Sequence, residues 1–95
     1  MKSHGDSTLR IDVSDVADAA ALHELLSSSF EFPDYYGGNW DAFDECIGDV
    51  EVPLRVVVLG IGSLAQHLPR EAQLLVSCLS DFARARPGEV EVHVS

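Results

Sequence analysis

Residues 29–54 read SFEFPDYYGGNWDAFDECIGDVEVPL, and this stretch decides how the chain is interpreted. It contains no lysine or arginine, and it holds two adjacent tyrosines, a Gly-Gly pair and a tryptophan. Its seven acidic residues are Glu31, Asp34, Asp41, Asp44, Glu45, Asp49 and Glu51. Acids beside aromatic residues on a short helix indicate a surface suited to a strongly basic partner. We therefore expect any catalytic chemistry to belong to that partner and this chain not to be an enzyme.

Charge is unevenly distributed along the whole chain. There are 16 acidic and 6 basic residues, giving a formal net charge of −10. Between Arg10 and Arg55 lie 11 of the acidic residues and no basic one. Such a field repels nucleic acid and anionic membrane surfaces, so we expect direct binding to neither. Acidic residues that serve only solubility would be expected to be scattered along the chain. That explanation fits less well with acids that are concentrated in one half.

Length and composition predict a single domain over residues 1–95, with 1–7 as a flexible tail. Apolar residues make up 46% of the chain, enough for one modest core. No apolar run approaches the ~20 residues of a membrane span, and the N-terminus lacks the apolar centre of a secretory signal. A cytoplasmic protein is therefore expected. Cys46 and Cys78 are expected to be reduced thiols, and no spacing indicates a metal or cofactor.

The hydrophobic patterns predict three strands and about four helices. Thr8–Val13 alternates apolar and polar residues, Leu54–Leu59 is almost entirely apolar, and Val90–Val94 alternates again. We expect the second strand to be buried on both faces at the centre of a parallel sheet, and the third to lie at an edge. Helical spacing covers Val16 to about Ser28, Trp40 to about Ile47, one turn at Ser63–His67, and Pro69 to about Ala85. The order β-α-α-β-α-α-β predicts an α/β fold with a three-stranded parallel sheet.

Short polar residues and glycine mark the expected helix ends. Ser14 or Asp15 can cap the first helix, because a short side-chain oxygen accepts hydrogen bonds from the free N–H groups. Ser27–Ser29 are expected to end it. Asn39 is the expected N-cap of the second helix, and Gly48 is expected to stop that helix.

The second helix is predicted to be amphipathic, with one acidic face and one apolar face. At ~100° per residue, Asp41, Asp44 and Glu45 share one face, and Trp40 lies on its border. The opposite arc holds Ala42, Phe43, Cys46 and Ile47. Acids near the C-terminal end of a helix cost about 0.3–1 kcal/mol each, because the helix dipole is negative there. A helix that accepts this cost is a candidate functional surface.

Other interpretations of these residues stay open at this point. The clustered carboxylates could act as acid and base in a small hydrolase, although adjacent residues on one exposed helix predict no pocket. They could bind a hard cation, although no EF-hand spacing is present. They could serve an unrelated basic partner. Tyr36 is expected to be a residue of the core, or one that supports the contact residues from behind, and not a contact residue. The dispersed histidines are expected at the surface: His4, His23, His67 and His93.

The stretch from Pro33 to Pro53 resembles the barstar family of intracellular ribonuclease inhibitors, whose namesake inhibits the bacterial nuclease barnase. The shared pattern is Pro-acid-Tyr-Tyr-Gly-x-Asn-x-Asp-Ala, followed by an acid, a cysteine, a glycine and a proline. Here these residues are Pro33, Asp34, Tyr35, Tyr36, Gly37, Asn39, Asp41, Ala42, Glu45, Cys46, Gly48 and Pro53. The resemblance implies a barstar-like three-layer fold and a partner that is a bacterial extracellular guanyl-preferring ribonuclease with a basic active-site cleft.

The resemblance also implies roles for individual residues. Asp41 and Glu45 would enter the nuclease cleft, where Glu45 would replace the substrate phosphate, and Tyr35 would pack near the catalytic histidine. The implied inhibitory interface comprises Tyr35, Gly37, Gly38, Asn39, Trp40, Asp41, Asp44, Glu45, Gly48 and Asp49.

This chain departs from the family pattern at several of these positions. Glu45 stands where the family has Asp, so its carboxylate reaches one methylene farther. Asp44 and Asp49 stand where the family namesake has tryptophans, and the loop after the helix is one residue shorter. Arg84 lies near the place of a further acidic contact. We therefore expect a target cleft that is more basic than that of barnase, or differently shaped.

Overall fold

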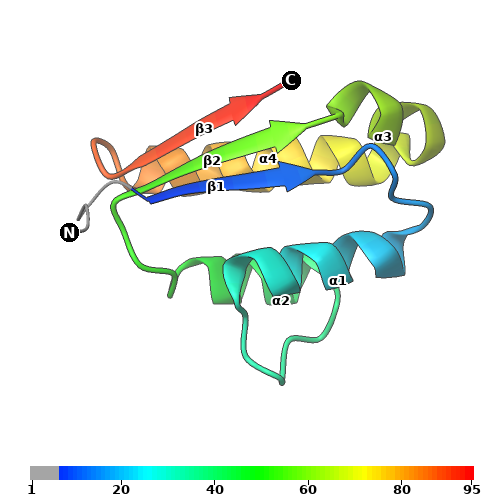
Figure 1. The fold of residues 1–95 in the computed structure, drawn as a ribbon. Helices are drawn as coiled ribbons and strands as arrows, with labels where there is room; N and C mark the ends of the chain where they lie inside the picture. The colour runs from blue at the N-terminus through cyan, green and yellow to red at the C-terminus, as the bar shows by residue number, and fades with distance from the viewer. Residues whose placement is uncertain (1–6) are drawn as a thin grey trace.

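The computed structural model of the protein describes residues 7–95. The tail expected at 1–7 lies outside these residues, apart from Ser7, which begins the first strand. The elements are β1 (Ser7–Asp12), α1 (Ala19–Phe30), α2 (Trp40–Ile47), β2 (Leu54–Leu59), α3 (Ile61–His67), α4 (Pro69–Ala85) and β3 (Val90–Val94), as Figure 1 shows. The predicted α/β class and element order are confirmed. None of the helices in this part of the chain is long and apolar enough to cross a membrane.

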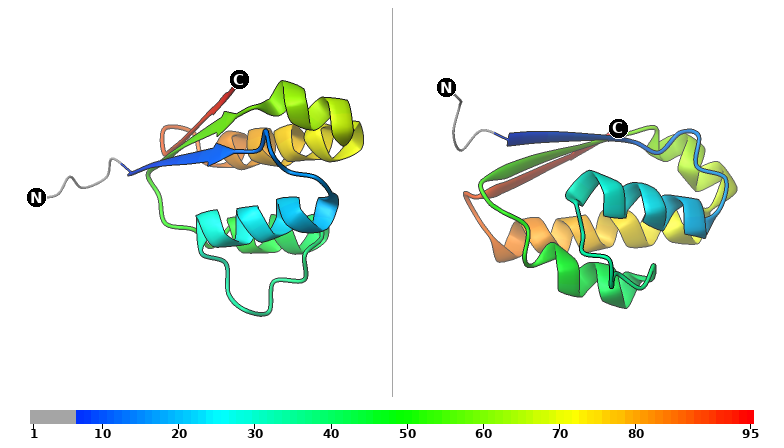
Figure 2. Two further views of the ribbon diagram at one scale, coloured as in Figure 1. Left: turned by 45° about the vertical axis from the view of Figure 1, so that its right-hand side comes forward. Right: turned by 60° about the horizontal axis from the view of Figure 1, so that its bottom comes forward.

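The three strands form one parallel sheet in the order β1-β2-β3, so the central place of β2 and the edge place of β3 are confirmed. The prediction that β2 is buried on both faces is wrong. Val56 and Val58 are fully buried, whereas Arg55 is exposed and its Nε lies 2.9 Å from Oε1 of Glu91 on β3. The helices lie on one side of the sheet (Figure 2). Val56 is buried beneath them, whereas the face that holds Arg55 is solvent-exposed at that residue.

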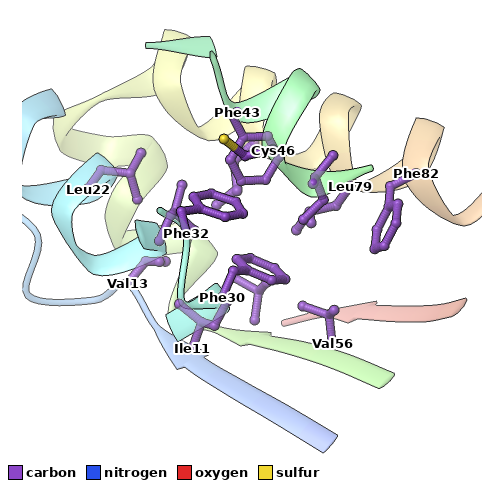
Figure 3. Packing of buried hydrophobic residues seen from close by; sticks show 14 of the residues in the cluster. Ile11, Val13, Leu22, Phe30, Phe32, Phe43, Cys46, Val56, Leu79 and Phe82 are labelled. Carbon is purple, nitrogen blue, oxygen red and sulfur yellow. The ribbon is translucent and has the colours of Figure 1, made fainter. Parts of the chain in front are cut away.

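The elements lie in three layers, as expected. Helices α1 and α4 pack on the sheet, and α2 packs against α4 farther from it (Figure 2). The layers meet at an aromatic cluster of Phe30, Phe32 and Phe43, with ring centroids 5.4–6.0 Å apart (Figure 3). Because all three rings are buried, this cluster fixes α2 relative to α1 and the rest of the core.

Helix α1 begins later than expected. Its N-cap is Asp18, whose Oδ1 accepts a hydrogen bond from the Ala21 N–H at 2.8 Å. Ser14 does not cap the helix, because the helix begins only at Ala19; the Ser14 N–H and hydroxyl donate to Oδ1 of Asp12 at 2.9 and 2.6 Å. The residues between β1 and Asp18 therefore form a connecting loop and not a first helical turn.

Helix α1 also ends later than expected. Ser27–Ser29 lie inside the helix, which continues to Phe30. Glu31 then adopts a left-handed conformation with φ 57°, and the Phe32 N–H donates to the Ser27 carbonyl at 2.9 Å. This turn delivers both Phe30 and Phe32 to the core, so burial of the two rings overrides the weak helix preference of the serines.

Candidate protein-binding surface

The segment that leads into α2 turns sharply at Gly38. The Tyr36 N–H donates to the Pro33 carbonyl at 3.0 Å, and Gly38 has φ +72°, a conformation that residues with a Cβ rarely adopt. Asn39 follows in an extended conformation, and its Oδ1 accepts a hydrogen bond from the Ala42 N–H at 2.8 Å. The prediction that Asn39 caps α2 is confirmed, and this cap fixes the direction of the acidic helix.

The acidic face of α2 points to solvent. Asp41, Asp44 and Glu45 are exposed, whereas Phe43 and Ile47 on the opposite side are buried. Within residues 7–95, the ion pairs are Arg55–Glu91, Arg84–Asp81 and His93–Glu91. No carboxylate of α2 takes part in them. The helix therefore presents negative charge that the described part of the chain does not neutralise.

Helix α2 ends at Ile47, as predicted, but Gly48 does not stop it by a left-handed turn. Gly48 has φ −67°, which any residue can adopt. A Cβ at this position would meet only the Glu45 carbonyl oxygen, at an ordinary 3.6 Å. The fold therefore does not require glycine here. Asp49 follows and is exposed, and the Gly48 carbonyl accepts a hydrogen bond from Nη2 of Arg86 at 2.6 Å.

The two adjacent tyrosines have different surroundings. Tyr35 is 79% exposed, whereas Tyr36 is half-buried and its hydroxyl lies 2.5 Å from Nδ1 of His23. Burial, with smaller effects from the neighbouring Cys46 and Cys78, raises the pKa of Tyr36 to about 12. The expected inward packing of Tyr36 is confirmed. The two cysteines are free, and Cys46 is buried as its position on the helix predicted.

His23 is not a surface residue, so that prediction is wrong for this histidine. It is 5% exposed, and burial lowers its pKa while the nearby Glu71 partly opposes the shift. Its ring contacts the Trp40 ring edge-on, with centroids 4.5 Å apart. His23 follows Leu22 and precedes Leu26 on the apolar side of α1, so its burial was visible in the helical spacing.

Trp40 lies on the border between the acidic face and the core, as predicted. It is half-buried, packs edge-on against Phe43 and donates from Nε1 to Oε1 of Glu71 on α4 at 2.7 Å. Two elements therefore hold one side chain: α1 through His23 and α4 through Glu71. Local sequence carries no signal for Glu71 or Arg86, because each contact joins residues more than 30 positions apart.

All ten candidate interface residues lie between positions 35 and 49, and apart from the half-buried Trp40 they are exposed. Two open hollows, one along α4 and one between α1 and the Gly37–Gly38 turn, are lined by none of the α2 carboxylates. Within residues 7–95, no three His, Cys, Asp or Glu side chains are grouped so that they could hold a metal ion. Among the described residues, the α2 carboxylates therefore lie on an open, exposed surface.

Comparison with known proteins relates nearly the whole fold to one family. The family model described as Barstar (barnase inhibitor) matches residues 7–95. A protein of Bacillus subtilis (strain 168) with the name "Putative ribonuclease inhibitor YrdF" is 43% identical over 49 residues, which are 50% of this chain and 54% of that protein. The chain thus spans about half the length of this curated relative. Because the family model covers all the described residues, the chain belongs to the barstar family.

Proposed function

We propose that this protein inhibits a small secreted bacterial guanyl-preferring ribonuclease, and that α2 blocks the basic active-site cleft of the nuclease. The observation that carries the proposal is the row of exposed carboxylates on α2, Asp41, Asp44 and Glu45, which form no ion pair within residues 7–95. Membership of the barstar family supports the same function.

Inhibition requires no reaction. A ribonuclease holds the RNA phosphate with cationic side chains, and a carboxylate offers the same groups two oxygens that accept charge-assisted hydrogen bonds. Glu45 would occupy the place of the phosphate, with Asp41 one turn earlier on the same face. The body of the inhibitor would then cover the cleft and exclude RNA. Exposed Tyr35 would add a rigid aromatic contact at the edge of this surface.

The surface is held in place before the partner arrives. The Asn39 cap, the Trp40–Glu71 hydrogen bond and buried Phe43 fix the position and rotation of α2. Fewer groups therefore need to be ordered on binding, which favours a tight complex. The unpaired negative charge also steers a basic partner during diffusion, a behaviour for which the barnase–barstar pair is itself a known example.

The test is a titration of the protein into a panel of small guanyl-preferring ribonucleases, barnase included, with residual cleavage of RNA as the readout. We expect stoichiometric inhibition of at least one enzyme. Glu45→Ala and Asp41→Ala should each weaken inhibition strongly. Glu89→Ala, which removes an exposed acid from the turn before β3, should leave it unchanged.

Two outcomes would refute the proposal. One is that no nuclease of the panel is inhibited at protein concentrations well above the enzyme. The other is inhibition that Glu45→Ala and Glu89→Ala reduce equally, because general charge and not the α2 face would then be responsible. Gly48→Ala adds a geometric check: the fold has room for this methyl group, so a loss of inhibition would place Gly48 against the nuclease.

A further inference from the structure

Arg86, the residue after α4, reaches across to the end of α2. Its Nη2 donates to the Gly48 carbonyl at 2.6 Å, a contact between residues 38 positions apart. Its guanidinium carbon lies 5.9 Å from the centroid of the Phe82 ring. In Figure 2, the segment that follows α2 passes beside the C-terminal end of α4. Arg86 therefore links the last turn of α4 to the segment that follows the acidic helix.

Backbone groups close only part of the end of α2: the Asp49 N–H donates to the Cys46 carbonyl at 3.1 Å and the Val50 N–H to the Ile47 carbonyl at 3.4 Å. The last carbonyls of a helix lack helical partners, and the helix dipole is negative there. Helix α2 has no basic residue in its last turn, and it carries Asp44 and Glu45 near that end. Gly48 is right-handed, so no left-handed cap closes the helix. No backbone N–H within residues 7–95 donates to the Gly48 carbonyl, which leaves Arg86 as its donor.

We propose that Arg86 is a positioning residue for the inhibitory surface: it caps α2 from α4 and holds Glu45 and Asp49 in the geometry that binds the partner. This inference rests on the proposed function. Arg86 places its positive charge beside the negative end of the helix by donating to a carbonyl oxygen and not to a carboxylate. No ion pair within 4.0 Å joins it to a carboxylate among the described residues, so the acids keep their charge for the partner.

The kinetics of binding separate this role from plain electrostatics. A positive charge beside an acidic surface repels a basic partner, so removing Arg86 should speed association slightly. Removing a cap should loosen Glu45 and Asp49 and speed dissociation. Arg84 is the matched control, because it carries the same charge at the same end of α4 but pairs with Asp81 and is exposed.

The first measurement uses barnase as the probe and compares wild type, Arg86→Met and Arg84→Met. Methionine keeps an aliphatic chain that can pack on Phe82 but has no donor. We expect both variants to associate slightly faster at low salt. Arg86→Met should dissociate about tenfold faster, because loss of a hydrogen bond from a charged donor loosens the end of α2. Arg84→Met should change the dissociation rate much less, because Arg84 pairs with Asp81 and not with the end of α2. Equal dissociation rates for the two variants would overturn the proposal.

The second measurement needs no partner. Amide hydrogen exchange of the free protein should be several-fold faster at residues 44–50 in Arg86→Met than in Arg84→Met, because local opening exposes these amides. Unchanged exchange would overturn the capping role, whatever the binding data. Failure of the wild type to inhibit any nuclease of the panel would count against the proposed function, and exchange would still decide the cap. Should Arg86→Met not fold, Arg86→Leu, which also lacks a donor, takes its place and is scored identically.

Discussion

Replacing Glu45 by glutamine should strengthen the fold and weaken the complex, and these opposite signs make it the sharpest test of the α2 surface. Glu45 is the third residue from the end of α2 and is exposed. It forms no ion pair within residues 7–95. Glutamine keeps the size and nearly the helix propensity of glutamate, so the change removes little besides charge.

The gain in stability follows from two local terms. An acid at the C-terminal end of a helix costs about 0.3–1 kcal/mol. Asp41 lies four residues earlier on the same face, and like charges at this spacing cost about 0.2–0.5 kcal/mol. Arg86 at the Gly48 carbonyl already offsets part of the dipole, so we take a total of about 0.5–1 kcal/mol. In a domain of this size, this raises Tm by roughly 2–8 °C.

The loss of affinity should be larger. Removing one partner of a buried charge pair costs about 2–5 kcal/mol, a range to which the barnase–barstar complex itself contributes. This corresponds to a Kd increased roughly 30- to 4,000-fold.

Urea unfolding measures the change in stability, and binding to whichever nuclease of the panel is inhibited measures the change in Kd. Glu89→Gln is the control for net charge. In 1 M salt the stability gain should shrink, because screening acts on exposed charges first. A Glu45→Gln variant that is less stable than wild type would refute the reasoning, since Glu45 would then have a structural partner.

Three further predictions follow from the same contacts. Association with the nuclease should slow markedly between low and 0.5 M salt while dissociation changes little; a rate independent of salt would contradict electrostatic steering. Trp40→Phe should lower the free energy of unfolding by about 1.5–3 kcal/mol, because it removes the hydrogen-bond donor to Glu71. Urea unfolding of the variant and of wild type measures this difference. An unchanged midpoint would mean that the hydrogen bond makes no net contribution to stability. Burial lowers the pKa of His23 in the folded protein, so the unfolded chain takes up this proton first. The stability that neutral His23 contributes should be complete above its unfolded pKa of about 6.5 and be lost as the pH falls from there to the lowered folded pKa. In His23→Gln this part of the pH dependence should disappear from urea midpoints between pH 7.5 and 5.5; the same dependence in both proteins would assign it to other groups.

Features set by neighbouring residues could be predicted from the sequence. The bounds of α2, its Asn39 cap and the split between exposed acids and buried Phe43 all depend on positions within one or two helical turns. The 3.6-residue period and the chemistry of a capping oxygen are sufficient to place them. The ten candidate interface residues come instead from the resemblance to the barstar family, and their role in binding stays a prediction.

Features that depend on what covers a segment could not be predicted in this way. The apolar run of β2 predicts burial on both faces, yet its outer face is solvent-exposed at Arg55 because the helices pack on the other side of the sheet. Asp18 caps α1 in place of Ser14 because the helix begins at Ala19, while Ser14 lies in the preceding loop and donates to Asp12. In both cases a local pattern permits several outcomes, and a neighbour selects one.

The supports of the candidate site are non-local for a physical reason. A surface that binds by charge must leave its own carboxylates unpaired, so its order has to come from contacts behind and beside the helix. His23, Glu71 and Arg86 provide these contacts from α1, α4 and the residue after α4, and each meets an aromatic ring, an indole N–H or a carbonyl of the 40–48 segment. Substitutions of the supports should therefore act on both stability and binding, whereas substitutions of the exposed acids should separate the two.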